Sequence, residues 1–431
     1  MDRTHYIRDA KGVRGPSVRI AGWVHDFRDL GKLKFVLVRD VSGIMQVTMK
    51  KGLVSDELLA AVKVNKEDVV SFEGTVKENK IAPDGVELVP SGFAHLNRVE
   101  RKLPVDPTGV VPSEIDTRLD HRYLDLRRKE TSLIFRTKSA AARLFRGKLQ
   151  ELGFLEIHPS AISGAATEGG ADVFSLQYFE NKAYLVQSPQ LFKQLAVIGG
   201  FDRVMMSVPV FRAEKHNTTS HLNEITQMDI EMGFADHGDA MDVLEKVALH
   251  VLSGVKKELG GEIAGAFGVE LVVPERVPRY TYTDLVSKLN DSGFEMKHGW
   301  DFTKEAEKKL HDILREELYF IYDWPTEVRA FYSMPSEENP AICHAFDLMY
   351  RGLEISSGAK RIHIPALLEE QLKKRGLDPY NFEFYINAFR MGAPPHAGWS
   401  IGLERLVMKM CSQENIRECM LFPRDRTRLL P

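Results

Sequence analysis

The stretch that decides the fold of this 431-residue chain begins with Phe211-Arg212-Ala213-Glu214. A few residues later it continues with Asn223-Glu-Ile-Thr-Gln-Met-Asp-Ile-Glu231. An arginine and a glutamate two residues apart on a strand point to the same side. The arginine can clamp an anionic oxygen through two hydrogen bonds, and the glutamate can accept a hydrogen bond from an amine. This pair suits a bound nucleotide, with the guanidinium at the α-phosphate and the carboxylate at the adenine amino group. Taken alone, the same pair is also the pattern of a surface ion pair.

Two further segments carry weaker signals of the same kind. Gly398-Trp-Ser-Ile-Gly402-Leu-Glu404-Arg405 is a glycine-rich strand that leads into a helix, so its backbone can approach a ligand closely. An arginine in the first helical turn adds charge to the positive end of the helix, which favours a phosphate. Gly153-Phe-Leu-Glu-Ile-His-Pro159 predicts a strand that ends at a proline after a long helix, predicted over 131–152.

In this order the three segments resemble the three signature motifs of class II aminoacyl-tRNA synthetases. The resemblance implies a dimer interface at the first motif, which ends at Pro159, and a bent ATP held by the other two on an antiparallel sheet. It gives Arg212 and Arg405 the catalytic role of neutralising the charge that develops on the phosphate oxygens. The residues that it implies for ATP are Arg212, Glu214, Ser220, His221, Leu222, Glu354, Gly402, Glu404 and Arg405. Many relatives have an aromatic residue at the position of Ile225, so the adenine contact differs here.

The organisation of the chain predicts an α+β multidomain protein. Residues 17–98 alternate as five strands with a short helix between the third and the fourth, which is the pattern of an OB-type β-barrel or of another small barrel. The expected domains are the OB-type barrel at 1–102, a proline-marked hinge at 103–130 and a catalytic domain at 131–431. The resemblance implies an antiparallel sheet flanked by helices for the last of these. Together with the barrel, it narrows the family to the aspartyl, asparaginyl and lysyl subgroup.

Composition excludes several other classes of protein. Hydrophobic residues make up 43% of the chain and charged residues 28%, the usual values for a soluble globular protein. No apolar run is long enough to span a membrane, and the N-terminal residues show no export signal. The three cysteines form no metal-binding motif and favour a reducing cytoplasm. The net charge of −3 means that any contact with RNA depends on local basic surface.

The segment Gln187-Ser-Pro-Gln-Leu-Phe-Lys193 bears on the amino-acid substrate. It resembles the pocket of aspartyl enzymes, in which Gln190 and Lys193 would hold the substrate. A carboxylate side chain requires fixed cations, and Lys193 with Arg361 would supply two. A solvated helix lysine is the alternative for Lys193. The resemblance completes the aspartate-binding set as Glu168, Gln190, Lys193, Arg212, Asp229, Ser357 and Arg361, with Asp229 either binding the ammonium group or orienting Lys193.

A run of oxygen-bearing side chains predicts a magnesium site. Asp347, Glu354 and Ser357 are hard donors of the type that Mg²⁺ prefers beside nucleotide phosphates. The resemblance assigns the metal to Glu354 and Ser357. Acidic residues on a strand are otherwise most often solvated.

Within the barrel, Arg28, Phe35, Gln46 and Glu87 match positions at which aspartyl relatives contact the tRNA anticodon. Phe35 can stack on an unstacked base, or it is an ordinary residue of the strand core. Archaeal aspartyl enzymes that accept both tRNA-Asp and tRNA-Asn resemble this chain in carrying His at the site of His25 and Pro at the site of Pro83. The alternative is that His25 is a strand-surface residue and Pro83 an ordinary turn proline.

The sequence therefore predicts a cytoplasmic homodimer similar to archaeal-type, non-discriminating aspartyl-tRNA synthetases. Its expected ligands are L-aspartate, ATP, Mg²⁺, tRNA-Asp and tRNA-Asn, and neither DNA nor a membrane is an expected partner. The alternatives are an asparaginyl enzyme, which Lys193 opposes, and a non-catalytic tRNA-binding paralogue. The joint presence of Arg212, Glu214, Glu354 and Arg405 opposes the paralogue.

Overall fold

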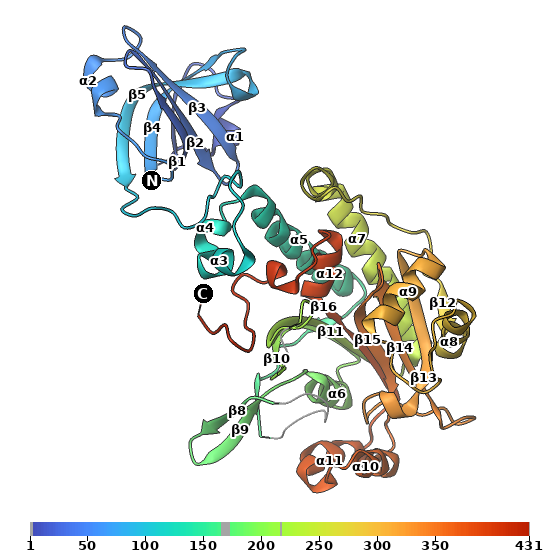
Figure 1. The fold of residues 1–431 in the computed structure, drawn as a ribbon. Coiled ribbons are helices and arrows are strands. Elements are labelled where there is room, and N and C mark those ends of the chain that lie inside the picture. The colour runs from blue at the N-terminus through green and yellow to red at the C-terminus, as the bar shows by residue number, and fades with distance from the viewer. Residues whose placement is uncertain (1–2, 165–172, 216–217, 431) are drawn as a thin grey trace. The chain divides into compact units, whose positions relative to one another are not determined.

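The computed structural model describes residues 3–164, 173–215 and 218–430 (Figure 1). Contacts between residues divide the chain into two units, Met1–Pro112 and Ser113–Pro431. Within the range 103–130, for which a hinge is predicted, the second unit contains the helices α3 (Ile115–Asp120) and α4 (Arg122–Asp125). No helix among the described residues is long and apolar enough to cross a membrane.

The first unit is a closed barrel with the strand order β1-β2-β3-β5-β4. Its elements are α1 (Ile7–Ala10), β1 (Ser17–Asp29), β2 (Leu33–Asp40), β3 (Gly43–Lys50), α2 (Asp56–Ala61), β4 (Val69–Glu78), the 3₁₀ turn η1 (Pro83–Gly85) and β5 (Val86–Asn97). Alternate residues such as Val36 and Val38 point inward and fill the core. The hydroxyl of Ser55 accepts a hydrogen bond from the Leu58 amide at 3.1 Å and caps α2. The predicted OB-type barrel is confirmed.

The second unit is built on an eight-stranded sheet with the order β12-β13-β14-β15-β16-β11-β10-β6. Its strands are β6 (Leu155–Glu156), β10 (Arg203–Phe211), β11 (Glu224–Gly233), β12 (Arg279–Thr281), β13 (Leu318–Pro325), β14 (Ile342–Tyr350), β15 (Leu353–Arg361) and β16 (His396–Gly402). The expected antiparallel arrangement holds for the six middle strands. Both edge strands are parallel to their neighbours, β6 to β10 and β12 to β13, so the sheet is mixed.

Two long helices form the main core with this sheet (Figure 1). The first, α5 (Lys129–Glu151), confirms the helix predicted over 131–152, and it ends before Gly153, whose φ is +81°. The second, α7 (His237–Phe267), begins at a capping box made by Asp236 and Asp239. Exposed ion pairs between the two helices join Arg136 to Glu262 and Arg143 to Glu258.

Smaller elements surround the sheet. The remaining helices are α6 (Gln190–Ile198), α8 (Tyr282–Asp291), α9 (Lys304–Leu314), α10 (Pro365–Lys374), α11 (Glu383–Arg390) and α12 (Leu403–Met410). Three 3₁₀ turns, η2 (Thr326–Val328), η3 (Pro379–Phe382) and η4 (Ile416–Cys419), lie between or after them. A separate three-stranded sheet has the order β7-β9-β8, with β7 (Ile162–Ser163), β8 (Ser175–Tyr178) and β9 (Asn181–Leu185). The helix α6 contacts β11, and α12 follows directly from β16, so both lie beside the strands that carry the predicted motifs.

Candidate active site and nucleic-acid interface

A buried cluster of opposite charges lies where α6 meets β11, β15 and β16. The ammonium group of Lys193 donates to Asp229 at 2.7 Å and to the backbone oxygen of Trp399 at 3.3 Å. The hydroxyl of Ser400 donates to the other oxygen of Asp229 at 3.0 Å. Asp229 is therefore in contact with Lys193, as one of the two roles predicted for it requires. Since Lys193 is 1% exposed, it is not a solvated helix lysine.

Glu231 joins Lys193 to Arg361, and the sequence analysis assigned it no role. The Nε of Arg361 donates to Glu231 at 3.0 Å, and the Lys193 ammonium lies 3.4 Å from the same carboxylate. Burial acts to raise the pKa of Glu231, but the adjacent Arg361 and Lys193 outweigh burial and hold that pKa below its ordinary value. A Cβ atom at Gly398 would lie 2.3 Å from the Glu231 carboxylate, so this position requires glycine.

Gln190 belongs to the same cluster. Its side-chain amide donates to Gln194 at 3.0 Å and to Glu231 at 3.4 Å. The hydroxyl of Tyr385 donates to Gln194 at 2.8 Å, and the Gln194 amide lies 2.8 Å from a ring nitrogen of His396. Gln190 and Gln194 therefore extend the fixed network of the pocket floor, which suits a site that must hold one small polar ligand in one orientation.

Arg212 and Glu214 lie just after β10, in the segment that connects it to β11. The side-chain amide of Asn223 donates to the backbone oxygen of Arg212 at 2.7 Å and to that of Glu214 at 3.4 Å. Asn223 thus fixes the backbone that carries both predicted nucleotide ligands. Within the described residues, the half-buried guanidinium of Arg212 makes no ion pair, so it is available for an anionic ligand.

His221 and Arg405 lie side by side near this segment. A ring nitrogen of His221 is 3.4 Å from the Arg405 guanidinium, which also donates to the backbone oxygen of Glu354 at 3.0 Å. Burial, followed by the charge of Arg405, lowers the pKa of His221, so this imidazole is neutral at pH 7. The hydroxyl of Ser220 lies 3.3 Å from the other ring nitrogen. The structure therefore brings Ser220, His221 and Arg405 together as predicted.

Two residues predicted to bind ATP have their side chains elsewhere. Glu404 is 1% exposed; its carboxylate accepts hydrogen bonds from Lys138 of α5 at 2.6 Å and from the Thr226 amide at 3.0 Å. The carboxylate therefore ties α12 to α5 and β11, and the expected role of Glu404 at ATP stays a prediction. The side chain of Leu222 lies in the main core. Gly402 stands at the N-cap of α12, directly before these residues.

The predicted magnesium ligands converge around Arg329, which the sequence analysis did not single out. The Arg329 guanidinium donates to both carboxylate oxygens of Asp347, at 2.6 and 2.9 Å, and to the Ser357 hydroxyl at 2.6 Å. Burial raises the pKa of Asp347 to about 6 in spite of this pairing. The Glu354 carboxylate is more open and lies 3.8 Å from Arg405.

A third carboxyl group, on Glu307 of α9, interacts with Glu354 and Asp347. Burial and the neighbouring Glu354 raise its pKa to about 8. Glu307 is therefore mostly protonated at pH 7, and the carboxylates of Asp347 and Glu354 face the guanidinium groups of Arg329 and Arg405. The oxygen donors are of the type that fits Mg²⁺, and the Glu354 carboxylate is the most open of them, while Asp347 and the Ser357 hydroxyl are both engaged by Arg329.

The four residues predicted to read an anticodon share one outer face of the barrel. Arg28 pairs with Phe35 across β1 and β2, Phe35 pairs with Thr48 of β3, and Gln46 pairs with Glu87 of β5. Phe35 is half-buried and alternates with inward-facing valines, so it belongs to the outer face and not to the core. The Glu87 carboxylate is held by Gln46 at 3.2 Å and by Asn79 at 2.8 Å.

The two positions predicted to relax tRNA specificity lie at a bulge and in a loop of the same barrel. His25 occupies the β-bulge of β1, where its ring nitrogen lies 2.9 Å from the Arg39 guanidinium. Burial, then the charge of Arg39, lowers the pKa of His25. Pro83 opens η1, which contacts β3, and the following Asp84 has a φ of +58°. The loop is closed by the hydrogen bond from the Asn79 amide to the Gly85 oxygen at 2.9 Å.

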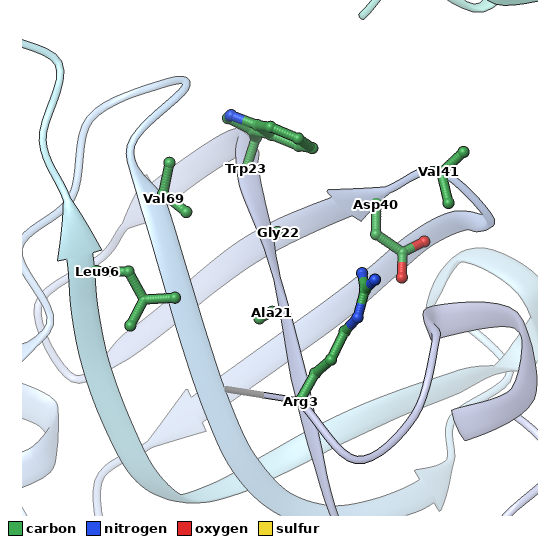
Figure 2. A pocket seen from close by; sticks show the side chains of 8 residues that line it. All are labelled: Arg3, Ala21, Gly22, Trp23, Asp40, Val41, Val69 and Leu96. Atoms are coloured by element: carbon green, nitrogen blue, oxygen red, sulfur yellow. The ribbon is translucent and has the colours of Figure 1, made fainter. Parts of the chain in front are cut away.

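A cavity of about 590 Å³ also opens on the barrel (Figure 2). Its lining residues come from the N-terminal segment, β1, the end of β2 and the turn after it, β4 and β5: Arg3, Ala21, Gly22, Trp23, Asp40, Val41, Val69 and Leu96. The cavity shares no residue with the predicted anticodon contacts, so it carries none of the predicted functions.

Glu168 and the rest of the predicted closing loop, Thr167 to Gly170, lie outside the described residues. The other predicted aspartate ligands are described. Among them, Gln190, Lys193, Asp229 and Arg361 are brought together, whereas Ser357 contacts Arg329 instead. Glu231 was missed although it stands two residues after Asp229 on a strand, a spacing that places both carboxylates on one face.

Comparison with known proteins agrees with this geometry. Residues 114–426 match the family model described as "tRNA synthetases class II (D, K and N)", and residues 18–95 match "OB-fold nucleic acid binding domain". The chain is 48% identical to the aspartate–tRNA(Asp/Asn) ligase of Methanocaldococcus jannaschii, over 100% of this chain and 98% of the relative. It is 46% identical to the aspartate–tRNA(Asp) ligase of Pyrococcus furiosus over 100% of both chains.

Solved structures give the same assignment at the level of fold. Asparaginyl-tRNA synthetase of Pyrococcus horikoshii, complexed with asparaginyl-adenylate, superposes with a TM-score of 0.94 at 30% identity over 100% of both chains. Aspartyl-tRNA synthetase of Entamoeba histolytica gives 0.89 at 31% identity, over 99% of this chain and 92% of that one. With its charged pocket, Arg212 just after β10, Arg405 in α12 and an N-terminal OB-fold, the chain belongs to the class II tRNA synthetases of the D, K and N group.

Proposed function

We propose that the chain is an aspartate–tRNA ligase that acts through an aspartyl-adenylate. The observation that carries the proposal is the donor arrangement of Arg361. Its Nε and Nη2 are engaged by Glu231 and the Gly398 oxygen, whereas its Nη1 makes no hydrogen bond among the described residues. The side chain is 5% exposed. The side-chain carboxylate of aspartate can accept hydrogen bonds from this nitrogen and from Lys193. The side-chain amide of asparagine would instead place its own N–H donors against the N–H donors of these two cations.

The activation step needs no general base, because the α-carboxylate of aspartate is already a nucleophile. It attacks the α-phosphorus of ATP in line and pyrophosphate leaves. Arg212 and Arg405 neutralise charge on the phosphate oxygens, and neutral His221 adds no competing charge beside Arg405. When bound at Glu354 and Ser357, Mg²⁺ supplies further charge neutralisation at the phosphates. The terminal ribose hydroxyl of the tRNA then attacks the mixed anhydride.

Both tRNA-Asp and tRNA-Asn are the proposed acceptors. The outer face formed by Arg28, Phe35, Gln46 and Glu87 offers a stacking ring and hydrogen-bonding groups for unstacked anticodon bases. The third anticodon base is C in one tRNA and U in the other. His25 can donate or accept through its ring, and Pro83 presents no backbone donor. The name of the M. jannaschii relative states both tRNAs, and that of the P. furiosus relative states one.

The asparaginyl alternative rests on fold alone. The asparaginyl enzyme of P. horikoshii has a TM-score of 0.94, but it is 30% identical, against 48% for the M. jannaschii aspartate ligase. The cations Lys193 and Arg361 at the pocket oppose it. The non-catalytic alternative is opposed by the intact pocket and by the positions of Arg212 and Arg405.

ATP–pyrophosphate exchange with aspartate and with asparagine tests the proposal. We expect exchange with aspartate and at most a trace with asparagine, since the latter leaves Arg361 facing a donor. Exchange with asparagine alone would identify an asparaginyl enzyme, and no exchange with either would indicate the non-catalytic paralogue. A parallel preparation of Arg405→Ala is the control for contaminating host synthetase.

The active enzyme is proposed to be a cytoplasmic homodimer. The strand β6 forms an edge of the eight-stranded sheet, and Leu155 within it is 48% exposed. An exposed apolar edge strand is a surface that pairing with a second copy would cover. Light scattering should give a mass close to twice 48.8 kDa, and Leu155→Glu should shift it toward the monomer. A monomeric parent chain at micromolar concentration would contradict the proposal.

A further inference from the structure

Two histidines and an aspartate from three different elements converge at the start of α7. His237 is the first residue of α7, Asp323 lies in β13 and His344 lies in β14. One potential ligand atom from each lies within 4.8 Å of the other two. The imidazole rings of His237 and His344 are stacked, with centroids 4.6 Å apart and planes at 13°. The Nδ1 of His344 is 4.0 Å from a carboxylate oxygen of Asp323.

This cluster is separate from the proposed active site. Successive residues of a strand point to opposite faces of the sheet. His344 shares its face with Phe346 and Leu348, which pack in the core with α7, whereas Asp347 points to the other face and pairs with Arg329. The cluster therefore lies on the face of the sheet opposite to the proposed magnesium ligands, and nothing in the proposed reaction uses it.

The backbone directs Asp323 toward the histidines at an energetic cost. The register between β13 and β14 shifts between Tyr322 and Trp324, so Asp323 is the extra residue of a bulge. Its φ of +57° is in the left-handed region, which side chains other than glycine adopt rarely and Asp and Asn most readily. Bulges of this kind re-aim a side chain, here the carboxylate of Asp323 toward His344.

The ring nitrogens themselves lack partners. The Nδ1 atoms of both His237 and His344 are buried and make no hydrogen bond among the described residues. A buried nitrogen without a partner is costly, and most such atoms are satisfied by protein, water or an ion.

We propose that His237, Asp323 and His344 bind one Zn²⁺ ion. Two imidazoles and one carboxylate are a common donor set for zinc, and a water molecule would complete four-coordination. Two ligand atoms on a tetrahedral zinc lie about 3.3 Å apart, so the present spacing closes by small rotations of the side chains. Access is open, since His344 and Asp323 are 26% and 34% exposed.

The surrounding charges favour a cation on balance. The negative charges of Asp236, Asp323 and Glu337 act at the histidines and attract a cation, whereas the positive charge of Lys360 repels it. The N-terminus of α7 is also unfavourable, but the Asp236 carboxylate caps it. The ion would join α7 to the bulge of β13 and to β14, so its role would be to stabilise the catalytic unit.

The test is zinc binding by the full-length chain after treatment with EDTA. Zinc content is measured by mass spectrometry after incubation with ZnCl₂ in excess MgCl₂ and gel filtration, and the melting temperature is recorded with and without ZnCl₂. We expect one Zn²⁺ per chain and a rise of several degrees in melting temperature, because a ligand that binds only the folded state stabilises it.

Two variants remove the ligands while sparing the fold. His344→Phe keeps a ring to stack on His237, and Asp323→Asn keeps a residue that tolerates positive φ. Both variants should lose the bound zinc and the rise in melting temperature that ZnCl₂ causes. In EDTA, their melting temperatures should match that of the parent. His298→Phe, outside the cluster, and Glu354→Gln, at the proposed magnesium site, should keep both. A parent chain without zinc, or variants that retain it as the parent does, would overturn the proposal.

Discussion

At the scale of single residues, the amino-acid pocket depends on two carboxylates that orient two cations. Asp229 and Glu231 hold Lys193 and Arg361 in one arrangement before any substrate arrives. Each side chain is at most 5% exposed, so removing one member leaves an uncompensated charge in a buried site. The pocket is therefore already organised for an anionic side chain, with the energetic cost of ordering met by the fold.

Lys193→Ala and Arg361→Ala should each abolish most aspartate activation. Losing one partner of a buried, hydrogen-bonded charge costs roughly 2–5 kcal/mol, which corresponds to about 30-fold to several thousandfold in kcat/KM. Exchange of ATP with pyrophosphate measures this loss directly. Lys374→Ala is the matched control, because Lys374 is an exposed helix lysine paired with Glu370. If both pocket variants exchange at near-parent rates, the aspartate assignment fails.

Arg212→Ala should abolish adenylate formation and leave tRNA binding nearly unchanged. The guanidinium is held on a backbone fixed by Asn223, in the second unit, whereas the proposed anticodon contacts lie in the barrel. Exchange kinetics and filter binding of tRNA-Asp measure the two properties separately. Lost tRNA affinity with surviving exchange would mean that the roles of the two units are reversed.

The sequence predicted most of the residues of the site but not their partners. Lys193 and Arg361 were predicted because a carboxylate substrate requires cations. Arg329 and Asn223 were not, since one acts by pairing with Asp347 and the other through backbone oxygens, and neither contact leaves a pattern in the sequence. Glu404 was predicted from its place in a motif, and only the structure shows that Lys138 of a distant helix neutralises it.

At the scale of elements, the spacing of apolar residues predicted a helix well where the sequence showed both a clear period and signals for the helix ends. The helix α5 begins two residues before the predicted 131 and ends one residue before the predicted 152. The parallel edges of the large sheet were not predicted, because the partner of a strand as short as β6 is decided by tertiary packing and not by its own pattern. The bulge at Asp323 was invisible for the same reason.

The prediction on which tRNAs the enzyme charges concerns two elements of the barrel, the β1 bulge and the loop before β5. His25→Trp with Pro83→Lys should selectively reduce charging of tRNA-Asn, because a larger ring at the bulge and a lysine in η1 restrict which third base fits. Aspartylation of both transcripts is the measurement, and charging of tRNA-Asp is its internal control. A parent enzyme that already rejects tRNA-Asn by roughly several hundredfold would defeat the idea.

The same bulge predicts how this choice depends on pH. Burial and Arg39 lower the pKa of His25 from its ordinary 6.5, so the ring is already neutral at pH 7 and stays neutral as the pH rises. The ratio of tRNA-Asn to tRNA-Asp charging should therefore be constant between about pH 7 and 8. A ratio that changes several-fold over this window in the parent, and not in His25→Trp, would show that the charge of His25 takes part.

At the scale of the whole molecule, the chain consists of two units with separate cores. The barrel closes its own sheet around Val36, Val38 and their neighbours, and the second unit packs α5 and α7 on its own eight-stranded sheet. Closure leaves the barrel without sheet edges, so it does not depend on the rest of the chain for pairing. Chemistry and anticodon contact are thus assigned to different units.

This division predicts that residues 113–431 alone retain aspartate-dependent exchange and lose most tRNA charging. Every described group proposed for the activation step, from Lys193 to Arg405, lies in that unit, and so does the β6 edge proposed for the dimer. Charging should fall because the barrel supplies the contacts that select and hold the anticodon. Exchange and aminoacylation of the fragment are compared with those of the full chain, and Arg212→Ala in the fragment is the control that should remove exchange. A folded fragment that charges tRNA-Asp as efficiently as the parent would show that the barrel is dispensable. One that is folded and dimeric but cannot activate aspartate would show that the barrel takes part in the chemistry.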